Sequence, residues 1–300
     1  WTSFDTGCYL DEALSQQVKL VKGYVANSHR RAIVQGFEDS SIQPSIDALN
    51  AVQRTPMKLN ETIVEAVEWC WSNDKSMGKF PTRAYIETPE RVEDFVSLTD
   101  VEKKGIRIKN KNIIVKNRQI DGQRSVMVQD LRVAKELLEY EQFYLPHNFC
   151  NRGRIYPIPH FSHHRDEHIK AMFEFANEKK VDANSFYWIA IQVANTGYFD
   201  KVSKKPMLDR IKWVNDNAEM IIEVAQDYKS TYDYWSKADK PFCFLAACQA
   251  YFKYLVEGEG STSGLPISLD GSNSGIQHYS AASLQEKDGS LVNLLSLIHI

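Results

Sequence analysis

One stretch of the chain, residues 265–280, concentrates side chains that could do chemistry. It reads Leu-Pro-Ile-Ser-Leu-Asp-Gly-Ser-Asn-Ser-Gly-Ile-Gln-His-Tyr-Ser. Ile267 and Leu269 alternate with a serine at the two-residue period of a half-buried strand, and turn-favouring residues then end the pattern. We therefore predict a strand that ends on Asp270 and presents its carboxylate to a pocket rich in hydroxyl and amide groups.

Beyond this carboxylate the apolar spacing becomes helical. Ile276, Tyr279 and Ala282 fall three residues apart, which predicts a helix after a short loop. Asp270 could instead cap that helix, or take the first position of a calcium loop. The calcium interpretation is weak because Ala281 stands where such a loop needs a glutamate with two ligand oxygens. The capping interpretation stays open on these residues alone.

Three segments resemble the single-subunit DNA-directed RNA polymerases of phages and mitochondria. The first, from Asp270 to Ser280, looks like the first catalytic motif of that family. The second, residues 145–161 with the Ala-Met-Phe-Glu-Phe-Ala run from Ala171, is similar to the Arg-Gly-Arg stretch at the start of the palm. The third, Lys-Pro-Phe-Cys-Phe-Leu-Ala-Ala-Cys from Lys240, resembles the helix before the catalytic strand. The three segments occur in the family's order, which favours a true relationship.

The resemblance implies a helix-rich α+β fold: a partial right-hand polymerase with thumb helices and an incomplete palm, and without fingers. Residues 1–43 would be the end of the N-terminal, promoter-reading region, residues 44–142 the thumb, and residues 143–300 the palm. Residues 296–300 depart from the family pattern, and we expect that they are not native. The chain begins at Trp1, so no targeting peptide can be read from it.

The thumb-like segment carries apolar residues at helical spacing and one strongly basic stretch. Between Lys103 and Arg118 the chain has no acidic residue. This stretch is either a solvated loop or an edge that contacts phosphates, since Lys and Arg gain affinity for nucleic-acid backbones by releasing condensed counterions. Its place in a thumb favours the second interpretation. The apolar residues that predict helices are Ile46, Leu49 and Val52, then Ile63, Val67 and Cys70, then Leu131, Ala134 and Leu138 in a long helix ending near Glu141.

Two arginines of the second segment are candidates for binding nucleic acid. Arg152 and Arg154 flank a glycine that permits close backbone approach, so their guanidinium forks suit a phosphate or a base edge. Cys150 departs from the family, which often has an acid or threonine there, and this leaves the hydrogen bonding around Arg154 open. The other residues that the resemblance places beside the template or the RNA–DNA hybrid are Tyr156, Gln277 and His278.

Lys170 lies, by resemblance, near the phosphates of the nucleotide and the template. Four histidines precede it, and two of them, four residues apart, could share a helical face and hold zinc. No cysteine or well-spaced fourth ligand supports a zinc site, so we expect that these histidines lie at a helix entry close to the phosphates. They are His160, His163, His164 and His168.

Nucleotidyl transfer, the reaction that the resemblance implies, needs an activated 3′ hydroxyl and a stabilised pyrophosphate. Two Mg²⁺ ions about 4 Å apart provide both. Asp270 offers a carboxylate and Gly271 a carbonyl oxygen, which suit this hard cation. The family's second aspartate, nucleotide-binding lysine and sugar-sensing tyrosine belong to later motifs that do not occur before Ile300. We therefore expect the chain as given to be truncated and inactive.

Gly275 bears on the choice of sugar. The A-family DNA polymerases, which share this palm, carry a glutamate five residues after the catalytic aspartate, and its side chain fills the space of a ribose 2′ hydroxyl. A glycine leaves that space open, which favours an RNA polymerase over the two alternatives, an A-family-like DNA polymerase and a non-catalytic nucleic-acid-binding remnant. The expected partners of a monomeric enzyme are a DNA template with its promoter, the RNA product and ribonucleoside triphosphates.

Composition sets only broad limits. The 300 residues are 43% hydrophobic and 25% charged, an ordinary balance for a globular protein. A net charge of −3 argues against a generally basic nucleic-acid binder, although a locally basic cleft would suffice for a polymerase. The apolar run 242–252 is shorter than the roughly 20 residues that span a bilayer. Five cysteines without a CxxC pair predict a reducing, intracellular setting, the host cytoplasm for a phage protein in preference to a mitochondrion.

Overall fold

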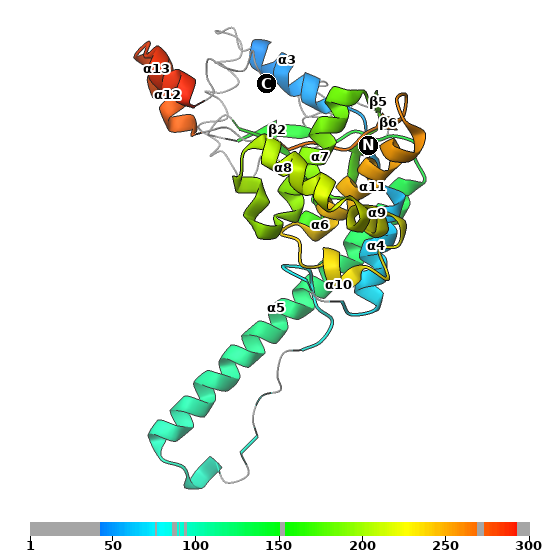
Figure 1. Cartoon of the computed structure of the whole chain (residues 1–300). Coiled ribbons are helices and arrows are strands. Elements are labelled where there is room, and N and C mark those ends of the chain that lie inside the picture. The colour runs from blue at the N-terminus through cyan, green and yellow to red at the C-terminus, as the bar shows by residue number, and fades with distance from the viewer. Residues whose placement is uncertain are drawn as a thin grey trace. The chain divides into compact units, whose positions relative to one another are not determined.

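The residues described by the computed structural model are 43–75, 77–85, 89, 91–92, 95–150, 154–268 and 273–292. They belong to two compact units, Trp1–Pro266 and Ile267–Ile300. Helices predominate in this part of the chain, where three antiparallel sheets of two strands each accompany them (Figure 1). This agrees with the predicted helix-rich α+β class. The predicted N-terminal region, apart from residue 43, lies outside the described residues.

Helix α4 (Glu61–Ser72) begins where its sequence predicts. The side chain of Asn60 accepts a hydrogen bond from the Ile63 N–H at 3.1 Å, which satisfies one of the N–H groups left open at a helix start. An acidic residue in the first turn, Glu61, is favourable to the helix dipole. The predicted apolar stripe is buried: Ile63, Val67 and Cys70.

The preceding helix, α3 (Gln43–Gln53), follows its predicted stripe only in part, because Leu49 is buried but Val52 is 40% exposed. Strand β1 (Met57–Leu59) then pairs antiparallel with β4 (Phe173–Phe175). This pairing joins the thumb-like and palm-like segments of the sequence in one unit. The other two sheets pair β2 (His147–Phe149) with β3 (Ile155–Pro157), and β5 (Lys179–Lys180) with β6 (Thr262–Ser263).

The basic stretch 103–118 lies inside a helix of 39 residues, α5 (Asp100–Leu138), so its interpretation as a loop is wrong (Figure 1). Thr99 and Glu102 form a capping box that starts the helix, and the helix ends three residues before the predicted Glu141. Buried residues recur every seven positions, about two turns, so they share one side of the helix. They are Ile113, Ile120, Met127 and Ala134, whereas the exposed basic residues include Lys104, Lys111 and Arg118.

Residues N-terminal to α5 contact its side chains. The Tyr85 hydroxyl donates a hydrogen bond to the Asp121 carboxylate at 2.8 Å, and the Arg124 guanidinium lies 4.5 Å from the centre of the Tyr85 ring. Lys103 donates from Nζ to the Val96 carbonyl oxygen at 2.9 Å. These contacts hold a preceding segment against a helix that is mostly exposed.

Helix α11 (Pro241–Glu257) is buried along its first half. It packs against α6 (Glu167–Lys170), α7 (Ala183–Gly197) and α9 (Ala218–Gln226). None of the described helices is long and apolar enough to cross a membrane. The buried residues of this first half are Phe242, Cys243, Phe244, Leu245, Ala246, Ala247 and Cys248. The remaining helices of the first unit are α8 (Met207–Asp216) and α10 (Tyr232–Trp235), with 3₁₀ turns η3 (Phe95–Ser97) and η4 (Phe199–Lys204).

The strand predicted before Asp270 is absent from residues 265–268, which join no sheet. Strand β6 ends earlier, at Ser263, and Pro266 has no N–H to give to a ladder. A two-residue alternation shows which side chains share a face but not whether a partner strand is available. Leu269 lies outside the described residues.

In the second unit the predicted helix is confirmed as α12 (Ser274–Ala282), which a short helix, α13 (Glu286–Leu291), follows. Its apolar side chains are not buried there, because Ile276 is 42% and Tyr279 63% exposed. The periodicity therefore predicted the secondary structure correctly but not the burial.

We expect Phe173→Ala to destabilise the first unit strongly. The Phe173 side chain is 1% exposed, and its ring centre lies 5.9 Å from that of Phe143 and 5.2 Å from that of Phe161. Truncation of such a side chain leaves a cavity and costs about 3 to 5 kcal/mol. Urea denaturation of the chain measures the loss. Leu208→Ala, at a side chain 78% exposed, is the control and should change the free energy of unfolding by less than about 0.5 kcal/mol. Equal losses for the two variants would contradict the assignment of Phe173 to the core.

Candidate nucleotide and nucleic-acid site

The predicted site residues fall into three groups. Those outside the described residues are Arg152, Asp270 and Gly271, so the structure does not test the predicted metal ligands. Those in the first unit are Arg154, Tyr156 and Lys170. Those in the second unit are Gly275, Gln277 and His278.

Arg154 and Tyr156 lie on the β2–β3 hairpin. Tyr156 stands opposite Asn148 in the register, and its side chain is 39% exposed. The Cys150 N–H donates a hydrogen bond to the Arg154 carbonyl oxygen at 2.8 Å. This contact uses backbone atoms only, so the cysteine at this position is compatible with it. The Arg154 side chain is exposed, as a residue that contacts nucleic acid requires.

The fold brings Tyr156 and Lys170 to the same pair of histidines. The Tyr156 and His164 ring centres are 6.0 Å apart, and those of His164 and His163 are 4.7 Å apart. Lys170 is close enough that its charge helps to lower the pKa of both histidines. His147, from strand β2, completes the cluster at 6.0 Å from His163. Sequence reasoning missed His147, which no local motif distinguishes.

Burial keeps this cluster uncharged near neutral pH. Burial, with the neighbouring charges of His164, His147 and Lys170, lowers the pKa of His163 to about 4. Burial also lowers the pKa of His147 and His164. In the described part of the chain, no group of three or more His, Cys, Asp or Glu side chains is arranged to hold a metal ion.

His168 corrects the expectation that all four predicted histidines lie near phosphates. It is 5% exposed, and its ring packs edge-on against Phe80 with the ring centres 5.2 Å apart. Burial lowers its pKa to about 4. His168 is therefore a core residue at the start of α6, although it lies only two positions before Lys170.

Glu167 fixes the short helix that carries Lys170. Its carboxylate accepts a hydrogen bond from the Cys243 N–H at 2.6 Å, at the start of α11, where Lys240 provides no side-chain cap. Burial raises the pKa of Glu167 to about 7, against the effect of the hydrogen bonds from Cys243 and Phe242. The buried carboxylate thus takes the place of a helix cap, supplied from a distant part of the sequence.

A buried ion pair joins α5 to the loop that precedes α6. Asp130 is 2% exposed and accepts hydrogen bonds from the Arg165 guanidinium at 3.1 and 3.4 Å. Burial raises the pKa of Asp130, while the charge of Arg165 opposes this effect. The pair therefore connects the thumb-like helix with the loop that contains His163 and His164.

In the second unit, Asn273 caps α12 and accepts a hydrogen bond from the Ile276 N–H at 3.4 Å. The cap of this helix is thus not Asp270. Gly275 is exposed, and a Cβ added to it would meet only the Asn273 side-chain oxygen, at 3.7 Å. Gln277 donates from its side-chain amide to the Val292 carbonyl oxygen at 2.7 Å, so this amide has a structural partner within the unit. His278 is exposed.

Comparison with known proteins identifies the relationship. Residues 179–298 match the family model described as DNA-dependent RNA polymerase. The chain is 29% identical, over 99% of its length, to DNA-directed RNA polymerase 1, mitochondrial, of Arabidopsis thaliana. It is also 29% identical, over 90% of its length, to the DNA-directed RNA polymerase of Enterobacteria phage K11 and to T7 RNA polymerase of Escherichia phage T7.

The chain is therefore related to the single-subunit DNA-directed RNA polymerases of phages and organelles, and the predicted resemblance is confirmed. It spans about 30% of the length of these relatives. They include phage, mitochondrial and chloroplastic enzymes, so the compartment differs among them.

The buried titratable groups predict a loss of stability in acid. His163 and His168 have a pKa of about 4 in the folded chain, against an ordinary value of 6.5, so between these values only the unfolded chain binds their protons. Stability then falls as the pH drops through this window, by up to about 1.4 kcal/mol per pH unit and histidine. Glu167 acts in the opposite sense, because the folded chain keeps its proton from pH 4.5 to about 7.

Glu167→Gln should therefore steepen the fall in stability between pH 6.5 and pH 4.5, because it removes the compensating group. His168→Gln should make the fall shallower. Urea denaturation midpoints of the chain across this range give both slopes. If neither variant changes the slope, these groups do not titrate as their burial implies.

Proposed function

We propose that the chain is part of an enzyme that synthesises RNA on a DNA template from ribonucleoside triphosphates. The observation that carries the proposal is similarity over 90% to 99% of the chain to proteins that are each named as RNA polymerases. These names favour RNA synthesis over the alternative of an A-family-like DNA polymerase. Because the chain spans about 30% of those relatives, the activity is proposed for a polymerase that contains it.

In this proposal Asp270 and the Gly271 carbonyl hold Mg²⁺. A donor set made only of oxygen atoms fits this hard cation. When it is bound, such an ion supplies charge neutralisation at the reacting phosphate. The motif offers one carboxylate, and the described residues contain no metal-binding cluster. A pair of ions would need a second carboxylate from beyond this motif, so we propose that the chain by itself does not polymerise nucleotides.

The residues described in the first unit support a role in binding the nucleic-acid backbone. Lys104, Lys111 and Arg118 recur every seven residues on the exposed side of α5, where cations can contact successive phosphates. We propose residues 44–142 as the thumb, which contacts the hybrid of template and product. In the palm, residues 143–300, Lys170 would face phosphates, and the exposed Arg154, Tyr156 and His278 would contact template or hybrid. Residues 1–43 would end the promoter-reading region of a monomeric enzyme.

Asp270→Asn tests the proposed function most simply. In the polymerase that contains this chain, the variant should bind template as the parent does but lose nucleotide addition, because it removes a metal-binding charge and hardly changes shape. Primer extension in Mg²⁺ and a separate template-binding assay measure the two properties. Asp216→Asn, at an exposed carboxylate of α8, is the control and should retain full activity. Extension by the Asp270 variant at more than about a hundredth of the parental rate would rule out the metal-ligand role.

Gly275→Glu should shift the preference from ribonucleoside toward deoxyribonucleoside triphosphates. The added carboxylate would occupy the space proposed for the 2′ hydroxyl, and each 1.4 kcal/mol of clash or unpaired contact changes selectivity about tenfold. Incorporation efficiencies for the two sugars measure the effect. Gly275→Ala is the control, since its methyl group meets no atom closer than 3.7 Å and should leave the ratio unchanged. An unchanged ratio in an active Glu variant would show that Gly275 does not face the ribose.

A further inference from the structure

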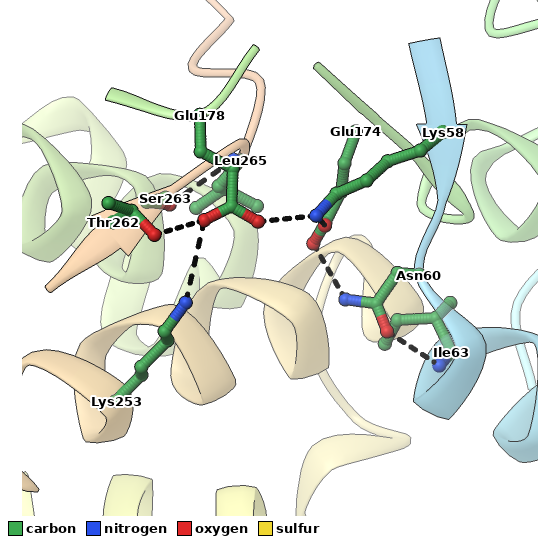
Figure 2. A network of polar contacts seen from close by, with 9 residues as sticks. All are labelled: Lys58, Asn60, Ile63, Glu174, Glu178, Lys253, Thr262, Ser263 and Leu265. Carbon is green, nitrogen blue, oxygen red and sulfur yellow. Dashed lines mark hydrogen bonds and ion pairs between the residues drawn. The ribbon is translucent and has the colours of Figure 1, made fainter. Parts of the chain in front are cut away.

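Glu178 joins three other elements just before the chain leaves the first unit. Its carboxylate accepts hydrogen bonds from Lys58 of β1 and from the Thr262 hydroxyl of β6 (Figure 2). The Lys253 ammonium group of α11 lies 3.6 Å from the same carboxylate. Glu178 itself stands one residue before β5, the strand that pairs with β6. The carboxylate thus fastens β6 on two sides.

The contacts extend from Glu178 to the start of α4. Lys58 also pairs with Glu174 of β4, with Nζ and the carboxylate oxygen 3.9 Å apart. Glu174 accepts a hydrogen bond from the Asn60 side-chain amide at 2.7 Å, and the carbonyl of that amide caps α4 (Figure 2). The network therefore includes a helix start that cannot shift without losing its cap.

The residues after β6 are held by backbone contacts. The Phe175 N–H donates a hydrogen bond to the Gly264 carbonyl oxygen at 2.8 Å. A Cβ added to Gly264 would overlap the Phe175 carbonyl oxygen, so only glycine permits this approach. The Leu265 N–H then donates to the Ser263 hydroxyl oxygen at 3.2 Å. Pro266 follows, and its ring restricts the backbone where the first unit ends.

The network is ionised throughout the neutral range. Hydrogen bonds from Lys58 and Thr262, with the charges of Lys58 and Lys253, lower the pKa of Glu178 to about 2. Its side chain is 24% exposed, so its ion pairs are shielded from water better than pairs on an open surface. Glu178 lies far from the predicted motifs in the sequence, and no local pattern marks it.

We propose that Glu178 and Thr262 are positioning residues for Asp270. They fix residues 262–265, from which the chain runs within five residues to the proposed metal-binding carboxylate. This inference rests on the proposed function. A loosened anchor would leave the carboxylate present but misplaced, and a misplacement of about 1 Å can lower a catalytic rate on the order of 100-fold.

Two pairs of variants test the proposal without deleting a large side chain. Thr262→Val removes the hydroxyl that donates to Glu178 and keeps the shape, whereas Thr262→Ser keeps the hydroxyl. Glu178→Gln keeps the size and removes the charge that Lys58 and Lys253 meet, and Asp216→Asn, at an exposed ion pair, is its control. If Glu178→Gln fails to fold, the Thr262 pair alone decides.

Two measurements are made on each variant. In the polymerase that contains this chain, kcat should fall about 10- to 100-fold for Thr262→Val and Glu178→Gln, with the KM for nucleotides within about twofold of the parent. Thr262→Ser and Asp216→Asn should match the parent. In the chain itself, amide hydrogen exchange at Phe175 and Leu265 should become faster in the first two variants only.

Each outcome supports or overturns the proposal. An unchanged kcat for Thr262→Val overturns it, and so does a loss that Thr262→Ser shares or one in which KM rises in proportion. Unchanged hydrogen exchange at Leu265 overturns it as well, because the anchor would then not hold that residue. An active parent with unaffected variants refutes this inference alone, whereas a parent that makes no RNA refutes the proposed function.

Discussion

The first unit depends on the burial of the start of α11. A helix start leaves N–H groups without partners, and residues 242–248 are buried where water cannot supply them. Glu167 satisfies this constraint by accepting a hydrogen bond from the Cys243 N–H at 2.6 Å. Since Glu167 is the first residue of α6 and Lys170 the last, the same contact that permits a buried helix also fixes the lysine proposed to face phosphates.

Two other contacts between distant residues connect the proposed functional parts to this core. The Asp130–Arg165 pair joins the thumb-like helix α5 to the loop with His163 and His164. The Glu178 network joins β1, α11 and β6 at the end of the first unit. In both cases a carboxylate at least three-quarters shielded from water pairs with a cation, an arrangement that is costly to break from one side.

Sequence reasoning predicted the elements whose signals are local. Asn60 and the stripe that begins at Ile63 marked α4, and the spacing from Ile276 marked α12. The motif resemblance gave the family, which comparison confirmed. The segment 103–118 was ambiguous because a run of cations is compatible with a loop and with an exposed helix face alike.

What sequence reasoning missed depends on contacts across the chain. The predicted strand at residues 265–268 failed because alternation does not reveal whether a partner strand exists. Glu167 and Glu178 gain their roles from partners 76 and 120 positions away, Cys243 and Lys58. His147 joins the histidine cluster only when β2 and β3 pair. The roles of Asp270 and Gly271 stay predictions.

The most direct test of the account is the product that the polymerase containing this chain makes. It would be incubated with a DNA template, all four ribonucleoside and deoxyribonucleoside triphosphates and Mg²⁺, and the product would then be sequenced and digested with ribonuclease. The account predicts a product that is complementary to the template and sensitive to ribonuclease. A ribonuclease-resistant DNA product, or template binding without any product, would contradict it.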